Sequence, residues 1–292
     1  MTRLAVFADI HGNLPALEAV LDDLVGRGID QIVVLGDSII WVPFDDEVLE
    51  RITGEGWPVI RGNHEFYLTD FQTPRAFPAW SDPVRYAPVH NMVPPLIPKW
   101  RQRVATWPDT LTLRFGDAPP VRLFHGLPEN PWKGISPSSP AEQVTELLGS
   151  IAERFILAAH THMPLDRTIG RWRIINPGSV GVPLDGNQAA QYAILDGNGE
   201  GWTPTFRRVP YDIKKVFDAY VSRRFVEEIG VMGKLAVEEM EMARVRLTPF
   251  NSWRAAERPN EPITWDLHRE FLTIDPRPYI NDDFFLPGPS GS

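Results

Sequence analysis

Apolar runs alternate with helical patterns over the first 61 residues of the chain. Residues 4–8, 31–35 and 57–61 form short, mainly apolar runs of the kind expected for strands, and the second run suits a strand buried on both faces. Between the first two runs, leucine and valine side chains recur at helical spacing over residues 14–24. A second helix is expected at about residues 45–52. The alternation predicts an α/β fold.

The pattern changes between residues 66 and 109. Prolines interrupt every regular pattern in this insertion, while tryptophans keep it too apolar for a disordered linker. We expect an ordered excursion over the carboxyl edge of the sheet, with one short helix near residues 99–105. Long ordered loops of this kind are either lids and specificity elements or packed insertions without function, and the sequence leaves both open.

Strand patterns return after the insertion, where we expect three hairpins. A helix and a buried strand should lie between the first two hairpins, and Ser139 is expected to cap the helix. The hairpins pair residues 110–115 with 121–124, 166–169 with 171–175 and 190–195 with 203–209, and the helix and strand cover about 140–151 and 155–159.

The character of the chain changes again after Pro210. We expect two charged amphipathic helices, at about residues 211–229 and 233–247, and then a tail rich in proline and tryptophan whose last residues, 289–292, fray. The chain therefore divides into a catalytic domain over residues 1–209, which contains the insertion at about 66–109, and a C-terminal helical extension and tail over residues 210–292.

Composition narrows the functional classes. The 292 residues are 43% hydrophobic and 23% charged, which is ordinary for a globular protein. A net charge of −9 disfavours general nucleic-acid binding, because that affinity comes from lysine and arginine. The chain has no cysteine, so any metal site must use oxygen and imidazole ligands. No apolar run approaches membrane-spanning length and no signal core precedes the first strand, so we expect a cytoplasmic protein without membrane contact.

Residues able to bind metals follow the expected strands. Asp9 and His11 lie just after the first strand, where open α/β sheets place their ligands. Taken alone, the pair is better explained as a polar turn than as half of a metal site. The later strands and hairpins end in further residues of the same kind, which are Asp37, Asn63, His64, His125, His160 and His162.

Oxygen and imidazole ligands suit manganese, iron or zinc better than calcium or magnesium. The set is too large for one ion and about right for two, and Asp37 has two carboxylate oxygens with which to bridge them. Two ions about 3.5–4 Å apart can bind the attacking and leaving oxygens of a phosphoryl group. Arg85, Arg101 and Arg103 either bring positive charge to such a group or are solvated.

Five blocks of sequence resemble those of the calcineurin-like metallophosphoesterase superfamily, in the order found there. The blocks are Asp9-Ile10-His11, Gly36-Asp37, Gly62-Asn63-His64-Glu65, His125-Gly126 and His160-Thr161-His162. The resemblance covers roughly residues 1–209. It implies an α/β (α+β sandwich) fold in which two packed mixed β-sheets are flanked by helices, with a dinuclear metal centre at their edge.

The resemblance also implies roles for single residues. One metal ion would be bound by Asp9, His11, Asp37 and His162, and the other by Asp37, Asn63, His125 and His160. The ions would be divalent transition metals, with manganese first and iron or zinc as alternatives. His64 would act as the catalytic residue, stabilising the transition state or protonating the leaving oxygen.

Further residues favour one branch of the superfamily. Residues 9–13 and 176–181 are similar to the compact bacterial branch, which contains phosphodiesterases and dinucleoside polyphosphate hydrolases. The Ser/Thr protein phosphatase branch continues Gly-Asp with Asp-Arg-Gly, whereas Ser38 and two isoleucines follow Asp37 here. We therefore expect a phosphoester hydrolase that cleaves a small phosphodiester or nucleotide-type substrate by attack of a metal-bridging hydroxide. A Ser/Thr-type protein phosphatase or phosphomonoesterase is the alternative.

A non-catalytic scaffold is the rival interpretation from another class. Retromer-type relatives use the same fold to bind proteins, and such scaffolds typically lose metal ligands or the catalytic histidine. No position of the set is missing here, so the resemblance favours an enzyme. The insertion and the C-terminal helices are expected to set substrate choice or to form a dimer contact, which would make the protein a homo-oligomer.

Overall fold

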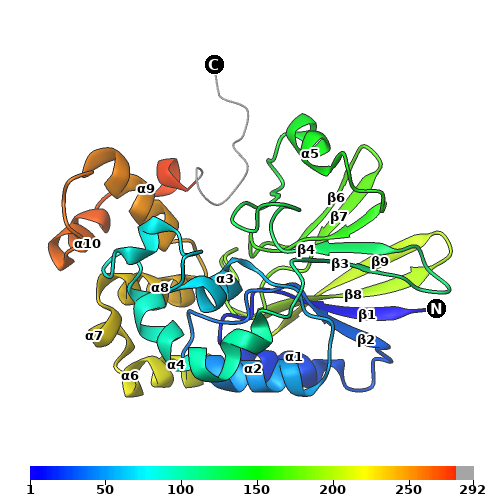
Figure 1. Ribbon diagram of the computed structural model, residues 1–292, viewed down its shortest axis with the longest axis horizontal. Coiled ribbons are helices and arrows are strands. Elements are labelled where there is room, and N and C mark those ends of the chain that lie inside the picture. Colours follow the sequence, from blue (N-terminus) through cyan, green and yellow to red (C-terminus); the bar gives the residue numbers. More distant parts are fainter. Residues whose placement is uncertain (281–292) are drawn as a thin grey trace.

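The computed structural model describes residues 1–280 and has two mixed β-sheets at its centre (Figure 1). The first sheet has the order β2-β1-β8-β9 and the second the order β3-β4-β5-β7-β6. The strands of the first sheet are β1 (Arg3–Phe7), β2 (Gln31–Val34), β8 (Ala190–Asn198) and β9 (Gly201–Val209). Those of the second are β3 (Thr110–Leu113), β4 (Val121–Phe124), β5 (Phe155–Leu157), β6 (Leu165–Ile169) and β7 (Trp172–Asn176).

Parallel pairing places several strand ends at one edge. β1 pairs with β2 in parallel, and β5 is parallel to both β4 and β7, whereas the hairpins and the β1–β8 pair are antiparallel. Buried side chains of both sheets, among them Val6, Leu123 and Leu157, form one core between them. The carboxyl ends of β1, β2, β4 and β5 therefore lie beside one another, as the sequence predicted.

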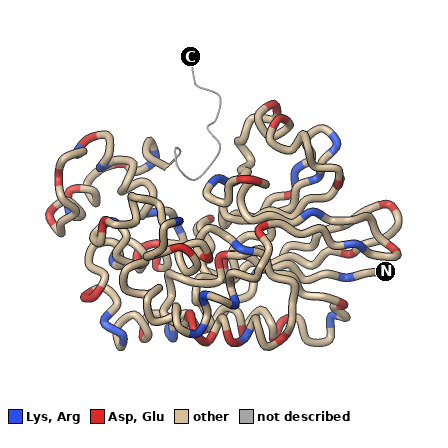
Figure 2. Tube along the Cα trace, in the orientation of Figure 1, with Lys and Arg blue, Asp and Glu red and all other residues tan. Residues whose placement is uncertain are grey.

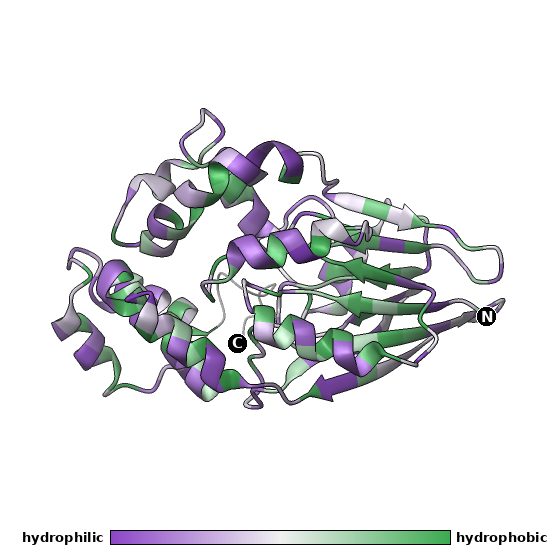
Figure 3. Ribbon diagram, turned by 90° about the horizontal axis from the view of Figure 1, so that it is seen from below, coloured by the Kyte–Doolittle hydropathy of each residue, from purple (hydrophilic) through white to green (hydrophobic). Residues whose placement is uncertain are grey.

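Helices cover the outer faces of both sheets. α1 (Leu14–Leu24), α2 (Asp45–Gly54) and α4 (Ala87–Val104) bury apolar residues against the first sheet, and α5 (Ala141–Leu148) covers the second (Figure 1). Figure 3 shows strands that are mostly hydrophobic beneath helices of mixed character. This is the mixed α/β fold, with two mixed sheets flanked by helices, that the sequence predicted.

The segment at residues 57–61 is not a strand, in contrast to the prediction. Val34 N donates to Pro58 O and Ile60 N donates to Val34 O, at 3.0 and 3.1 Å, and these two bonds leave only an isolated bridge between Val34 and Val59. Pro58 has no N–H to extend the pairing, and Arg61 N already turns to Pro108 O. The segment still runs along β2, so Asn63 and His64 reach the same edge.

The insertion is mainly helical, although its prolines predicted irregular structure. It contains α3 (Asn63–Asp70), which starts just before it, the 3-10 turn η1 (Pro78–Ser81) and the 18-residue α4. Three prolines lie inside α4, and each removes a backbone hydrogen bond. The buried residues of α4 include Val89, Val93, Leu96, Trp100 and Val104, which recur at helical spacing. Packing of this face outweighs the lost hydrogen bonds, and the short helix expected at 99–105 is only its last part.

The C-terminal part forms more helices than the two expected. They are α6 (Ile213–Ser222), α7 (Phe225–Ile229), α8 (Val231–Met242), α9 (Leu247–Glu257) and α10 (Trp265–Phe271), followed by the turn η2 (Arg277–Tyr279). The expected helices are interrupted at Arg224 and Ala243, and Gly230 lies between them as the sequence predicted; all three residues adopt positive φ. The helices share a core with Val42, Val182 and Leu184 from loops at the sheet edge. The fraying expected at residues 289–292 lies outside the described residues.

Two smaller features concern capping and charge. Ser139 does not cap α5, because the helix begins after Pro140 and the Ser139 hydroxyl accepts a bond from Ser136 N instead. Figure 2 shows acidic and basic positions interspersed over sheets and helices. Within residues 1–280, none of the helices is both long and apolar enough to cross a membrane.

Candidate metal centre

All eight residues selected from the sequence are buried at one edge of the two sheets. The loops after β1, β2, β4 and β5 and the start of α3 bring them together. The side chains form overlapping groups whose ligand atoms lie within 4.8 Å of one another: Asp9, His11 and His162; His11, Asp37 and His64; and Asp37, His125 and His160. Asp37 and His11 link the groups into one centre.

The first group lies beneath β1. His162 Nε2 lies 3.7 Å from an Asp9 carboxylate oxygen and 3.1 Å from His11 Nε2. His11 Nε2 is 3.8 Å from Asp37 Oδ2. Two imidazole nitrogens and the carboxylate oxygens of Asp9 and Asp37, from the loops after β1 and β2, therefore surround one point.

The third group, Asp37, His125 and His160, surrounds the other side of Asp37. His125 Nε2 lies 3.3 Å from Asp37 Oδ2 and 3.1 Å from Asn63 Oδ1. Asn63 Oδ1 is in turn 2.9 Å from His160 Nδ1. Asp37 therefore faces both groups, which is the position of a bridging ligand.

His64 belongs, with His11 and Asp37, to the group that links the other two. Its Nε2 is 3.9 Å from Asp37 Oδ2, and its Nδ1 lies 3.1 Å from Ile39 O. The ring packs edge-on against His11, with centroids 4.6 Å apart. Its side chain also lines a large cavity, which most of the other centre residues do not.

Backbone carbonyls orient three of the imidazole rings. Nδ1 lies 2.9 Å from Ile40 O in His11, 2.7 Å from Leu35 O in His125 and 2.5 Å from Val182 O in His162. An Nδ1–H donor in each ring directs the Nε2 lone pair into the centre when the ring is neutral.

Burial keeps most of these imidazoles neutral. Burial, followed by repulsion from neighbouring imidazoles, lowers the pKa of His11 and that of His160 to about 3. The same causes lower the pKa of His162 well below its usual value. Burial lowers the pKa of His64 as well, although the Asp37 carboxylate opposes this. At neutral pH each of these four rings therefore keeps one nitrogen lone pair that can bind a metal ion.

Asp37 and His125 behave as an ion pair. Burial alone would raise the pKa of Asp37 and lower that of His125. Attraction across 3.3 Å outweighs burial, so the pKa of Asp37 falls well below its usual value and that of His125 rises to about 9. Burial raises the pKa of Asp9, whereas His125 lowers it. A metal ion binding to His125 would displace its proton.

The centre has the donor set that divalent cations require. Both carboxylate oxygens of Asp9 are buried, and no side chain of residues 1–280 donates a hydrogen bond to them. Around them converge imidazole nitrogens, the Asp37 carboxylate and the Asn63 side-chain amide, and buried acceptors of this kind are stabilised by cations. The residues present therefore fit two divalent metal ions of the kind that bind oxygen and nitrogen.

The backbone of the centre is strained. Five of these residues adopt left-handed conformations, with φ of 53° at Asp9, 51° at His11, 53° at Asp37, 73° at His160 and 55° at His162. Residues other than glycine rarely adopt this region, and strain of this kind clusters at functional sites. Hydrogen bonds between the loops hold the conformation, for example from His11 N to Asp37 O at 2.9 Å.

Glu65 is a functional residue to which the sequence gave no role. Its carboxylate accepts hydrogen bonds of 2.7–2.8 Å from the backbone N–H groups of Asp37, Ser38 and Gly62. It therefore fixes the loop that carries the Asp37 carboxylate. A Cβ at Gly62 would lie 2.2 Å from Asp37 Oδ1, so this loop also requires glycine. The signal that could have revealed Glu65 is its place three residues after the N-cap Gly62, where its carboxylate accepts from the Gly62 N–H.

The block at residues 176–181 supports the first group. Ser179 Oγ donates to Asp9 O at 2.8 Å and accepts from Val182 N at 2.8 Å. Asn176 donates to Ala159 O at 3.0 Å, just before His160. These bonds tie β7 to the loops after β1 and β5, which gives the block a positioning role.

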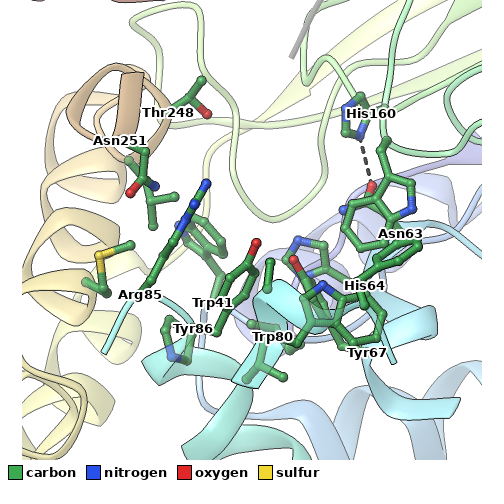
Figure 4. Close-up of a pocket in the computed structure, with 18 of the residues that line it drawn as sticks. Trp41, Asn63, His64, Tyr67, Trp80, Arg85, Tyr86, His160, Thr248 and Asn251 are labelled. Atoms are coloured by element: carbon green, nitrogen blue, oxygen red, sulfur yellow. Dashed lines mark hydrogen bonds between the residues drawn. The ribbon is translucent and has the colours of Figure 1, made fainter. Parts of the chain in front are cut away.

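Two of the cavities that adjoin the centre are lined partly by the C-terminal helices. The smaller, of about 50 Å³, is enclosed by metal-centre residues and by side chains of the C-terminal part, among them Glu239 and Leu247. The larger, of about 460 Å³, is lined by His64, by aromatic side chains and by Arg85 (Figure 4). Arg101 and Arg103 instead bond backbone carbonyls of Leu68 and Thr53. Both the insertion and the C-terminal helices thus reach the site.

The chain belongs to the calcineurin-like phosphoesterase superfamily, whose domain model matches residues 2–200. This membership identifies it as a metal-dependent phosphoester hydrolase, as the sequence predicted. It is 29% identical over 206 residues to phosphodiesterase YfcE of Escherichia coli, covering 67% of this chain and 88% of that protein. It is 28% identical over 259 residues to the uncharacterized protein MJ0912 of Methanocaldococcus jannaschii, covering 78% of this chain and 96% of that one.

Solved structures agree with the sequence comparison. A metallophosphoesterase from Sphaerobacter thermophilus superimposes with a TM-score of 0.64 at 25% identity, covering 83% of this chain and 99% of that one. The hypothetical protein PH1004 from Pyrococcus horikoshii gives a TM-score of 0.68 at 26% identity, covering 79% of this chain and 97% of that one. Each of these two structural matches covers more residues of this chain than the 209 of the expected catalytic domain, because 79% of 292 residues exceeds 209.

Proposed function

We propose that this chain hydrolyses a small phosphodiester at a centre of two divalent ions, with manganese as the preferred metal. The observation that carries the proposal is the set of three overlapping ligand groups, which Asp37 and His11 link, with His64 in the linking group and facing a large cavity. In this proposal Asp9, His11, Asp37 and His162 bind one ion, and Asp37, Asn63, His125 and His160 bind the other. The likeness to a phosphodiesterase of Escherichia coli favours a diester over a monoester.

The ions supply an activated water molecule and neutralise charge on the phosphoryl group. The protein residues do the rest. Hydrolysis adds water to phosphorus and breaks the bond to the alcohol, which then needs a proton. His64 is placed to donate it, because its ring lies between the centre and the cavity. Burial lowers the pKa of the free His64, and the negative charge of a bound phosphate favours its protonated form.

Turnover of two chromogenic substrates tests the proposal. Bis(4-nitrophenyl) phosphate and 4-nitrophenyl phosphate are supplied in parallel with manganese to the wild type and to His64→Asn. We expect the diester to be the better substrate, and His64→Asn to lose at least ~100-fold in kcat while still binding two manganese ions. His268→Asn is the matched control, since this buried histidine pairs with Glu238 in the C-terminal helices.

Each result has a defined meaning. Faster hydrolysis of the monoester would replace the phosphodiesterase by a phosphatase. Full activity of His64→Asn would contradict its catalytic role. No turnover of either substrate by a protein with two bound manganese ions would contradict the proposed substrate class and favour a protein-binding role.

A further inference from the structure

The cavity beside His64 is the feature that most constrains the substrate. Its volume is about 460 Å³, and its walls come from the loop after β2, the insertion, the loop around Trp132 and helix α9. Because His64 faces this cavity, the alcohol that leaves phosphorus in the proposed reaction would depart into it. The inference below rests on that proposed function.

Aromatic rings form much of the cavity wall. The Tyr67 ring lies 4.8 Å from Trp80 and 5.3 Å from Trp132, measured between centroids, and Trp80 lies 5.9 Å from Trp132. Trp41 lies 5.8 Å from the His64 ring. Contiguous rings of this kind favour flat groups that stack on them or meet their edges.

Arg85 brings a positive charge to the same cavity. Its side chain is half-buried and lies near the Tyr86 ring, at 5.6 Å from the centroid. Within residues 1–280 no carboxylate lies within ion-pair distance of its guanidinium, whereas Arg61 and Arg75 pair with Asp109 and Asp70. Asn251 Oδ1, also at this cavity, is buried without a hydrogen-bond partner among the described residues.

Arg85 lies across the cavity from the centre residues Asn63 and His160 (Figure 4). In Figure 4 Arg85, Thr248 and Asn251 lie on one side of the cavity, and Asn63 and His160 lie on the other, with the Trp41 side chain between them. An anion held by Arg85 is therefore a second group and not the phosphate at the metal centre. Low polarity around the rings strengthens its attraction to the guanidinium.

We propose that this cavity is a subsite for a leaving alcohol built on a flat ring system, and that Arg85 selects alcohols carrying a second anionic group, a carboxylate or a phosphate. The ring stacks on the wall formed by Tyr67, Trp80 and Trp132, and its hydroxyl points to His64. Arg85 is then a specificity-determining residue of the enzyme.

Binding of free alcohols tests this subsite without turnover. The probes are 6-hydroxy-2-naphthoate and 2-naphthol, which differ only in the carboxylate, and calorimetry on the manganese-loaded protein measures their affinity. We expect the carboxylate to improve binding by roughly tenfold. Arg85→Met abolishes this preference, and Arg85→Lys keeps part of it because it keeps the charge but loses the planar fork. Arg103→Met, outside the cavity, keeps the full preference.

A second pair of probes tests the ring. 4-Hydroxybenzoate should bind more tightly than 4-hydroxycyclohexanecarboxylate, which has the same groups on a puckered ring. An unchanged carboxylate preference in both Arg85 variants, or equal binding of the flat and puckered rings, would overturn the subsite. If the probes bind as expected but no diester is hydrolysed, the proposed function fails and the subsite stands.

Discussion

The position of side chains at strand ends could be predicted from the sequence, because an apolar run followed by polar residues marks the end of a strand. An apolar run followed by Asp9 and His11, or by His160 and His162, places those residues at the sheet edge whatever the rest of the chain does. Their surroundings could not be predicted. The His125 ring is oriented by Leu35 O and the His162 ring by Val182 O, partners that only the folded chain brings near. The left-handed backbone at these positions likewise depends on contacts between loops.

Glu65 provides a prediction at the residue scale. The Glu65 carboxylate accepts from three backbone N–H groups. In Glu65→Gln an amide NH₂ faces one of these N–H groups and repels it. The loop that carries Asp37 should therefore be held less firmly. We expect manganese affinity, measured by calorimetry, to fall by roughly 10- to 100-fold. Glu18→Gln, which alters the ion pair between Glu18 of α1 and Arg51 of α2, should leave the manganese affinity unchanged. Equal affinities in the two variants would show that Glu65 does not position the bridging carboxylate.

Elements were predicted well where one pattern dominated and poorly where two conflicted. In α4 the prolines argued against a helix while Val89, Val93 and Leu96 recurred at helical spacing, and packing decided the outcome. At residues 57–61 composition favoured a strand, but Pro58 limited the pairing to one bridge. The extent of a helix or strand depends on the neighbour it packs against, which the local pattern does not contain.

Asp23 provides a prediction at the scale of elements, because it ties α1 to the first sheet. Burial alone would raise its pKa, but Arg207, Tyr192 and Arg27 lower it to about 2. A depressed carboxyl pKa stabilises the fold above the unfolded value of about 4, and this contribution disappears as pH falls toward 2.

Asp23→Asn should therefore lower the free energy of unfolding at pH 7 and have little effect near pH 2. Urea denaturation at both pH values measures this change. The exposed neighbour Asp22 supplies the control, since Asp22→Asn should change neither. A loss for Asp23→Asn that is as large near pH 2 as at pH 7 would contradict a role for its ionised form.

At the scale of the whole molecule, the sequence placed the insertion over the shared edge of the sheets, but it did not show which of its side chains, or which of those from the C-terminal helices, line the site. α8 and the start of α9 bring Glu239 and Leu247 to the smaller cavity, and the insertion supplies Trp80 and Arg85 to the larger. These contacts join residues far apart in sequence. They support the proposal that residues 210–292 and the insertion act as accessories to a catalytic domain at 1–209.

Metal removal should destabilise the whole molecule, because the buried acceptors of the centre then lack a cation. We expect a chelator to lower Tm by roughly 5 °C or more and manganese to restore it, since saturating ligand stabilises by about 3 kcal/mol at 100 times its Kd. Asp37→Asn should lose the response to manganese, and Asp22→Asn should keep it. A Tm that manganese leaves unchanged in the wild type would argue against a metal centre.

A metal titration followed by turnover tests the central claim most directly. Metal-free protein is titrated with manganese while the hydrolysis of bis(4-nitrophenyl) phosphate is recorded. The account predicts that the rate rises until two equivalents per chain are bound and is then constant. A rate that saturates at one equivalent, or no hydrolysis with two equivalents bound, would contradict a phosphodiesterase that works with two metal ions.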